Sequence, residues 1–265
     1  MADTNNLKEY YTFDLKNDLP CFTDKNLLLV DALIRYDSNY SVTTDENHPD
    51  YKESYAGILS RMKADFFDFN KTDEHLLEVV KSINKINSTH LGAYNGIQLT
   101  VDTIKKMENL KERLLNGDGS VVYEIACAGI NRYNFSFATK FCTYVSELAL
   151  ETNDKYCIYD NVVQSVLPLY IHHYVSEEKA KEYYKIVNKS KPELSRIESK
   201  IDSKLKSKNE PKGYDKYREL INEIIKGIKE KDGKNITYAE FDHLVWYYFK
   251  GSEKKVQQAL NTLLP

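Results

Sequence analysis

The sequence predicts an all-α fold, and three observations support this class. Apolar residues recur at helical spacing along almost the whole chain. Only ten glycines and six prolines interrupt the 265 residues, too few for the many tight turns of a β-rich chain. No segment shows the alternation of apolar and polar residues that is typical of a half-buried strand. We therefore expect helices throughout and almost no sheet.

Local signals predict where the helices begin. Thr23 or Asp24 can cap a helix through LLLVDALIRY, and Thr72 or Asp73 can cap one through EHLLEVVKSINKI, because short polar side chains accept hydrogen bonds from unpaired amides. Thr237-Tyr-Ala-Glu240 is a capping box that starts a helix through Lys250. Helical patterns also cover residues 55–66, 100–115, 121–128, 161–172, 176–189, 191–207, 213–230 and 252–263, and residues 38–51 read as a loop.

The charge balance does not by itself indicate a nucleic-acid-binding protein. The net charge is −3, but residues 179–234 carry 17 basic and 10 acidic side chains on an otherwise acidic chain. Such a segment can provide an electrostatic footprint for phosphate. Solvated helix faces explain the same residues and are the favoured interpretation.

Composition also limits the cellular location. No stretch approaches the eighteen apolar residues of a membrane span, and the polar N-terminus MADTNNLKEY does not resemble a signal peptide. The four cysteines stand singly in apolar surroundings, as expected of reduced core residues. We expect a cytoplasmic protein with no membrane association.

Three segments that resemble ligand-binding motifs lack essential residues. The stretch KDGKNITYAEF has lysine and glycine where a calcium loop needs acidic ligands, and Gly117-Asp-Gly119-Ser lacks the lysine of a phosphate-binding loop. The pair His172-His173 has no cysteine or carboxylate at ligand spacing. We expect neither a metal nor a cofactor.

The segment Tyr133–Phe141 reads as a turn leading into a helix whose first turn carries Lys140. Unpaired backbone amides at the start of a helix bind phosphate oxygens without a basic side chain. Lys140 lies among apolar positions that include Phe137 and Val145, where partial desolvation would leave a neutral, nucleophilic amine. The alternative is a surface lysine whose stem lies across apolar residues.

Asp160 follows the apolar run Tyr156–Tyr159 and precedes a new helical pattern. Its structural role would be the N-cap of that helix. A carboxylate held by helix amides also stays fixed and ionised. It could then stabilise a cationic sugar and accept a proton from an attacking amine. The two roles are compatible.

The order of these features resembles the signature of helix-hairpin-helix DNA glycosylases, especially the branch that removes 8-oxoguanine. The order is a turn, Thr-Lys on an amphipathic helix, a loop, an apolar run, Asp and a new helix. By that resemblance, Lys140 is the Schiff-base nucleophile and Asp160 the catalytic carboxylate. The hairpin residues implied to contact DNA phosphate are Asn134, Ser136, Ala138 and Thr139. The family often has Gly-x-Gly in the hairpin, where this chain has Ser136 and Ala138.

A second resemblance to the 8-oxoguanine branch lies in a late helix. Asp242 and Trp246 are one helical turn apart and share a face. In that branch two residues at this spacing contact the flipped base. The polar residue forms hydrogen bonds with the base, and the aromatic residue stacks on it. The alternative is a core tryptophan and a solvent-facing aspartate.

The resemblance implies a two-lobed helix-hairpin-helix DNA glycosylase fold, with residues 72–165 as the lobe that carries the hairpin and residues 1–71 with 166–265 as the other. It implies a monomeric DNA glycosylase with AP-lyase activity. The substrate would be duplex DNA with an oxidised or otherwise modified base, in base-excision repair or phage defence. Two alternatives are an inactive helical DNA-binding or interaction protein of the same fold, and an unrelated helical scaffold with Lys140 and Asp160 exposed.

Overall fold

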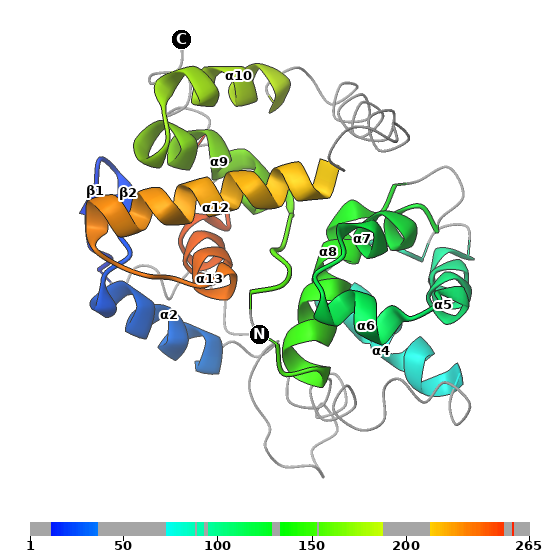
Figure 1. Cartoon of the computed structure of the whole chain (residues 1–265). Coiled ribbons are helices and arrows are strands. Elements are labelled where there is room, and N and C mark those ends of the chain that lie inside the picture. Colours follow the sequence, from blue (N-terminus) through cyan, green and yellow to red (C-terminus); the bar gives the residue numbers. More distant parts are fainter. Residues whose placement is uncertain are drawn as a thin grey trace. The chain divides into compact units, whose positions relative to one another are not determined.

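The computed structural model describes residues 12–36, 73–87, 89–92, 95–128, 133–152, 154–187, 213–251 and 256. Most of these residues are helical (Figure 1), which confirms the all-α prediction. Sheet in the described residues is limited to one short pair of strands, as expected for a chain with almost no sheet. Strands β1 (Leu15–Lys16) and β2 (Leu19–Pro20) pair antiparallel around Asn17 and Asp18, which both have positive φ.

The chain divides into two compact units. Unit 1 is Ile34–Tyr159 and unit 2 is Ala2–Leu33 with Asp160–Pro265, so unit 2 is built from both ends of the sequence. The expected boundary at 165/166 would cut through a helix, α9 (Asn161–Tyr174), all of which belongs to unit 2.

Unit 1 contains six helical segments in the described range. They are α4 (Asp73–Ile86), α5 (Gly96–Lys106), α6 (Leu110–Leu115), α7 (Gly119–Ala126), α8 (Phe135–Tyr144) and the π-helix η3 (Val145–Ala149). Helix α4 packs on α5 and α8, while α7 packs on α5, α6 and α8. Fully buried residues of this core include Val79, Ile83, Leu114, Ile125 and Phe141.

The single helix predicted over residues 100–115 is two helices, α5 and α6. They are separated at 107–109, where Met107 is extended and Asn109 has a φ of 52°. A left-handed residue cannot continue a right-handed helix, and asparagine tolerates this conformation better than most residues. The break was not visible in the apolar periodicity, which runs on through it.

Unit 2 is arranged around α9. This helix contacts α10 (Glu177–Val187), α12 (Gly213–Asp232) and α13 (Tyr238–Phe249). The other elements are the two strands and α2 (Asp24–Tyr36). Aromatic rings fill the core, with Phe22 stacked on Phe241 at 5.9 Å and Tyr170 edge-on to Phe241 at 5.4 Å.

The predicted helix starts can be compared with the observed caps. The capping box is confirmed, because the Thr237 hydroxyl accepts from the amide of Glu240 at 3.1 Å and the Glu240 carboxylate accepts from the amide of Thr237 at 2.8 Å. At α2 the cap is Thr23, whose hydroxyl accepts from the amide of Asn26 at 3.3 Å. Helix α4 begins at Asp73.

Several predictions fall outside the described residues. They are the helices at 55–66, 191–207 and 252–263, the loop at 38–51 and Thr72. Within the described part of the chain, no helix is both long and apolar enough to cross a membrane. All four cysteines are thiols rather than disulfides, and of the four only Cys142 and Cys157 are buried. Cys127 is exposed, contrary to the expectation of four core thiols.

Candidate functional site

Helices α7 and α8 pack against each other (Figure 1), and α8 carries Lys140. The amide of Asn134 donates to the carbonyl of Ala126 at 2.8 Å, which joins the end of α7 to the start of α8. Asp118 caps α7 by accepting from the amide of Ser120 at 2.8 Å. The turn residues 129–132 lie outside the described range.

At the start of α8, some of the groups expected to contact phosphate already form hydrogen bonds within the helix. The amide of Ala138 donates to the carbonyl of Asn134 at 3.0 Å, so it belongs to the helical ladder. Ser136 and Phe137 also precede that first helical bond, and the first amides of a helix have no acceptor within the helical ladder. Asn134 does not cap α8 with its side chain, and its buried Oδ1 has no hydrogen-bond partner in the described part of the chain. Any phosphate contact at this helix start therefore falls to the amides around Ser136.

Lys140 lies in the second turn of α8, rather than in the first turn as expected, and is only 5% exposed. Its helix is buried continuously from Phe137 to Tyr144. The alternatives of a surface lysine and of an exposed Lys140–Asp160 pair are therefore wrong, since Asp160 is also only 8% exposed. Such deep burial of a lysine is rare in folded proteins, because burial of an ammonium group is unfavourable unless the group is paired.

Asp160 is the N-cap of α9. Its Oδ1 accepts from the amides of Val162 and Val163, at 2.9 and 3.0 Å, and its backbone is extended. The predicted capping role is confirmed. Because two amides hold the same oxygen, the orientation of the carboxylate is fixed by the start of α9.

Thr139 connects α8 to the segment that leads to Asp160. Its hydroxyl accepts from the amide of Tyr159 at 3.1 Å and lies 3.4 Å from the Tyr159 carbonyl and 3.1 Å from the Ser136 carbonyl. The ring of Tyr159 also packs edge-on against Phe135, with 5.2 Å between centroids. Thr139 is completely buried, so its side chain serves this internal contact and not an external phosphate.

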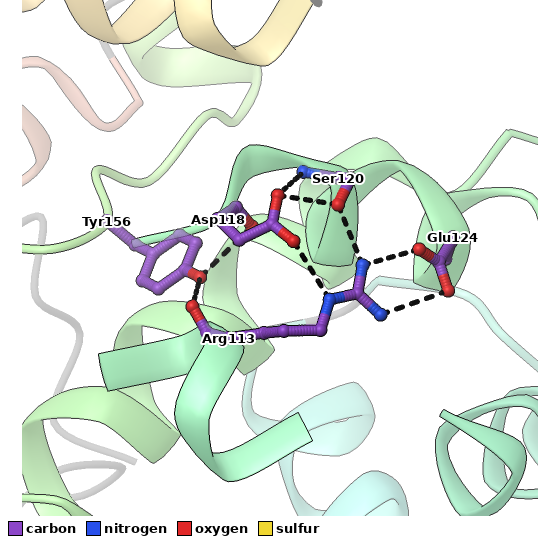
Figure 2. A network of polar contacts seen from close by, with 5 residues as sticks. All are labelled: Arg113, Asp118, Ser120, Glu124 and Tyr156. Atoms are coloured by element: carbon purple, nitrogen blue, oxygen red, sulfur yellow. Dashed lines mark hydrogen bonds and ion pairs between the residues drawn. The ribbon is translucent and has the colours of Figure 1, made fainter. Parts of the chain in front are cut away.

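A polar network around Arg113 supports the α6–α7 turn (Figure 2). The guanidinium contacts Asp118 at 2.8 Å, Ser120 at 2.7 Å and Glu124 at 2.5 Å. Hydrogen bonding to Glu124 raises the pKa of Arg113 above its ordinary value. Burial alone would raise the pKa of Asp118, but hydrogen bonds from Ser120 and Arg113 lower it.

The same network reaches the segment before Asp160. The Tyr156 hydroxyl donates to the carbonyl of Asp118 at 3.1 Å and lies 3.4 Å from that of Arg113 (Figure 2). Sequence reasoning missed this network. The Asp118-Gly-Ser120 order is a recognisable N-cap signal, but nothing local to the sequence pairs Arg113 with Glu124 or Tyr156 with the turn.

Immediately after α8 the chain forms the π-helix η3, a rare form that is frequent at functional positions. It carries Glu147, whose pKa is raised to about 7 by burial, with repulsion from Asp154 adding to the effect. This carboxyl titrates near neutral pH, which the sequence did not indicate.

Asp242 and Trp246 lie on α13 of unit 2, and both are half-buried. The ammonium of Lys250 lies 3.6 Å from the centroid of the Trp246 ring, a cation–π contact with one face of the indole. In the sequence, His243 lies between Asp242 and Trp246. Burial lowers the pKa of His243 to about 4, although the negative charges of Asp31 and Glu240 act in the opposite direction. In the described part of the chain, no three His, Cys, Asp or Glu side chains gather as metal ligands.

The candidate residues are thus distributed over the two units. The hairpin residues and Lys140 belong to unit 1, whereas Asp160, Asp242 and Trp246 belong to unit 2. The peptide bond between Tyr159 and Asp160 joins the two groups.

Comparison with known proteins adds one partial similarity. A family model described as an N-terminal domain matches residues 39–149. This segment is less than half of the chain and includes α8 with Lys140, but it ends before Asp160. No curated protein and no solved structure matches the chain.

Proposed function

We propose that this protein is a DNA glycosylase with AP-lyase activity that removes an oxidised or otherwise modified base, with an 8-oxoguanine-like purine favoured, from duplex DNA. The observation that carries the proposal is Lys140, a buried lysine on α8, the helix that packs on α7, at the position that the family signature assigns to the nucleophile. Asp160, held by two amides at the start of α9, supports it as the fixed carboxylate.

In the proposed reaction the Lys140 amine attacks the C1′ atom of the damaged nucleotide. A bond forms between nitrogen and C1′ as the bond between C1′ and the base breaks, and the base leaves with the electron pair. Asp160 stabilises the positive charge that develops on the sugar and accepts a proton from the amine. Opening of the sugar ring then yields a Schiff base with Lys140, from which β-elimination cleaves the strand.

DNA binding is proposed to depend on amides as well as on positive charge. The amides of Ser136 and Phe137, at the start of α8, would bind a phosphate oxygen. Asp242 would accept hydrogen bonds from N–H groups of a flipped base, and Trp246 would stack on it. The protein would act as a cytoplasmic monomer, in repair or in defence against phage with modified bases.

Borohydride trapping tests the chemistry. Wild-type protein incubated with duplex DNA containing 8-oxoguanine or an abasic site should form a covalent adduct on reduction. Lys140→Gln should form none while still binding the DNA, because only the amine is lost. Lys111→Gln, at an exposed position on α6, is the matched control and should trap like wild type.

The outcomes separate the competing functions. Binding without trapping by wild type on several oxidised and modified bases would favour the inactive DNA-binding protein. Trapping that persists in Lys140→Gln would show that another amine is the nucleophile. Absence of binding to lesion-bearing and abasic duplexes at low salt would exclude both DNA-directed functions.

A further inference from the structure

Thr139 makes polar contacts that a helical threonine does not ordinarily make. A buried threonine in a helix usually satisfies its hydroxyl with a carbonyl one turn back, as Thr100 does with Gly96 at 2.7 Å. Thr139 has such a contact, with the Ser136 carbonyl. It also contacts both backbone groups of Tyr159, which is 20 positions further along the chain.

These contacts connect the residues that immediately precede the two proposed catalytic groups. Thr139 is followed by Lys140 on α8, and Tyr159 is followed by Asp160 at the start of α9. The Thr139 hydroxyl accepts a hydrogen bond from the Tyr159 amide and lies near the Tyr159 carbonyl. It therefore restrains the backbone on both sides of the Tyr159 Cα. The Tyr159 carbonyl carbon is bonded directly to the nitrogen of Asp160, so the restraint acts one covalent bond from the carboxylate residue.

We propose that Thr139 is a positioning residue that holds Tyr159 against α8 and, through the Tyr159 peptide bond, restrains the backbone nitrogen of Asp160. This inference rests on the proposed glycosylase function. Nucleophilic substitution at a sugar carbon requires the amine and the carboxylate to be aligned together, and displacement of a catalytic group by about 1 Å can lower a rate by roughly a hundred-fold. Thr139 supplies the restraint that would prevent such a displacement.

The Tyr156 hydroxyl gives an independent anchor at the other end of the same segment, through the α6–α7 turn. Residues 156–159 are therefore held at both ends by polar contacts. The anchor at Tyr156 is four residues from Asp160, whereas the contact with Thr139 acts on the adjacent residue. We therefore assign the positioning role to Thr139.

The experiment compares Thr139→Val, which keeps the shape but loses the hydroxyl, with Thr139→Ser, which keeps the hydroxyl. Thr100→Val is the matched control, because Thr100 is also completely buried in a helix of unit 1 and donates to a carbonyl one turn back. In the described part of the chain its hydroxyl makes no hydrogen bond with the 156–159 segment. Each variant is assayed for single-turnover base excision, for borohydride trapping and for the Kd of lesion-bearing duplex.

Thr139→Val should lower the single-turnover rate about ten- to a hundred-fold with a Kd within about two-fold of wild type. Thr139→Ser should restore most of the rate, and Thr100→Val should resemble wild type. Amide hydrogen exchange at Tyr159 should be faster in Thr139→Val than in wild type or Thr139→Ser, since its acceptor is missing. Circular dichroism and thermal unfolding establish that each variant is folded.

A folded Thr139→Val with wild-type excision rate would overturn the positioning role. So would an equal loss of rate in Thr100→Val, because the effect would then come from general loss of packing. If Thr139→Val does not fold, Thr139→Cys is compared with Thr139→Ser. These two variants differ only in a sulfur in place of an oxygen, and the thiol is a much weaker hydrogen-bonding group than the hydroxyl. Equal rates in that pair would also overturn the inference. Failure of wild type to trap DNA would instead refute the proposed function.

Discussion

The hydroxyl of Tyr156 donates to the backbone carbonyl of Asp118 at a distance of 3.1 Å. Tyr156 is 1% exposed, so this donor has no access to solvent as an alternative partner. The contact ties the segment that leads to Asp160 to the turn that begins α7. The Tyr156 hydroxyl should therefore contribute to the stability of unit 1, together with the contact between Thr139 and Tyr159 at the other end of the segment.

Replacement of Tyr156 with phenylalanine should destabilise the protein by about 0.5–1.5 kcal/mol, the usual net contribution of a buried hydrogen bond. The loss of the hydroxyl also leaves the Asp118 carbonyl with one partner fewer. Urea unfolding followed by circular dichroism measures the change.

Tyr170→Phe is the matched control in unit 2. Tyr170 is completely buried, and its hydroxyl has no hydrogen-bond partner in the described part of the chain. Removing an unsatisfied hydroxyl should be neutral or stabilising. A larger destabilisation by Tyr170→Phe than by Tyr156→Phe would contradict the assignment of these contacts.

The two roles of Asp160 can be separated by substitution. Asp160→Asn keeps an N-cap side chain and should unfold within about 0.5 kcal/mol of wild type, whereas Asp160→Ala should lose about 1 kcal/mol. Both should lose base excision by roughly a hundred- to a thousand-fold, because neither carries the charge that would stabilise the sugar cation. Excision by Asp160→Asn at the wild-type rate would remove Asp160 from the mechanism.

His243 should make the protein less stable in mild acid. Its pKa is about 4 in the folded protein, because burial disfavours the charged ring, compared with about 6.5 when unfolded. The unfolded chain therefore binds a proton more readily between these values. The resulting stability is fully present above pH 6.5 and is lost as the pH falls toward 4, by an amount on the order of 2 kcal/mol.

His243→Gln should flatten this part of the stability profile. The free energy of unfolding, measured at intervals from pH 4 to pH 8, should fall less steeply below pH 6.5 in the variant than in wild type. The difference between the two proteins in free energy of unfolding at pH 8 serves as the internal reference, because His243 is neutral at that pH in the folded and unfolded states. Parallel profiles for the two proteins would show that His243 is not the group responsible.

Glu147 should produce the opposite dependence. Burial raises its pKa to about 7, compared with about 4.3 in an unfolded chain, so the folded state holds the proton more tightly. Its contribution is present at pH 4 and is lost as the pH rises through 7, again by an amount on the order of 2 kcal/mol. Glu147→Gln, which stays neutral, should be more stable relative to wild type at pH 8 than at pH 5 in the same unfolding assay.

The close approach of α9 and α12 should make Gly227 intolerant of any side chain. A Cβ at this position would lie 2.2 Å from the backbone carbonyl oxygen of Tyr174, which cannot move without displacing a helix. Gly227→Ala should therefore destabilise the protein by about 1–3 kcal/mol, despite the higher helix propensity of alanine. Gly92→Ala is the control, because no described atom lies within 4 Å of that Cβ, and thermal unfolding should change little.

Much of the helical structure followed from local signals in the sequence. The capping box at Thr237, the cap at Asp160 and the helical patterns of α9 and α12 all depend on residues within one or two turns of each other. Such signals act through backbone amides and neighbouring side chains, so they can be read without knowledge of the rest of the fold.

Other features were determined by tertiary packing. The division of the chain at 159/160, the burial of Lys140 and the break before α6 depend on what each segment packs against. The partners of Arg113 and the contact of Thr139 with Tyr159 join residues that are distant in sequence. The resemblance of the local sequence to the glycosylase signature singled out Lys140 and Asp160. Only the folded chain revealed the Thr139 hydroxyl in contact with Tyr159, because hydrogen bonds at that sequence separation form only when helices and loops are packed together.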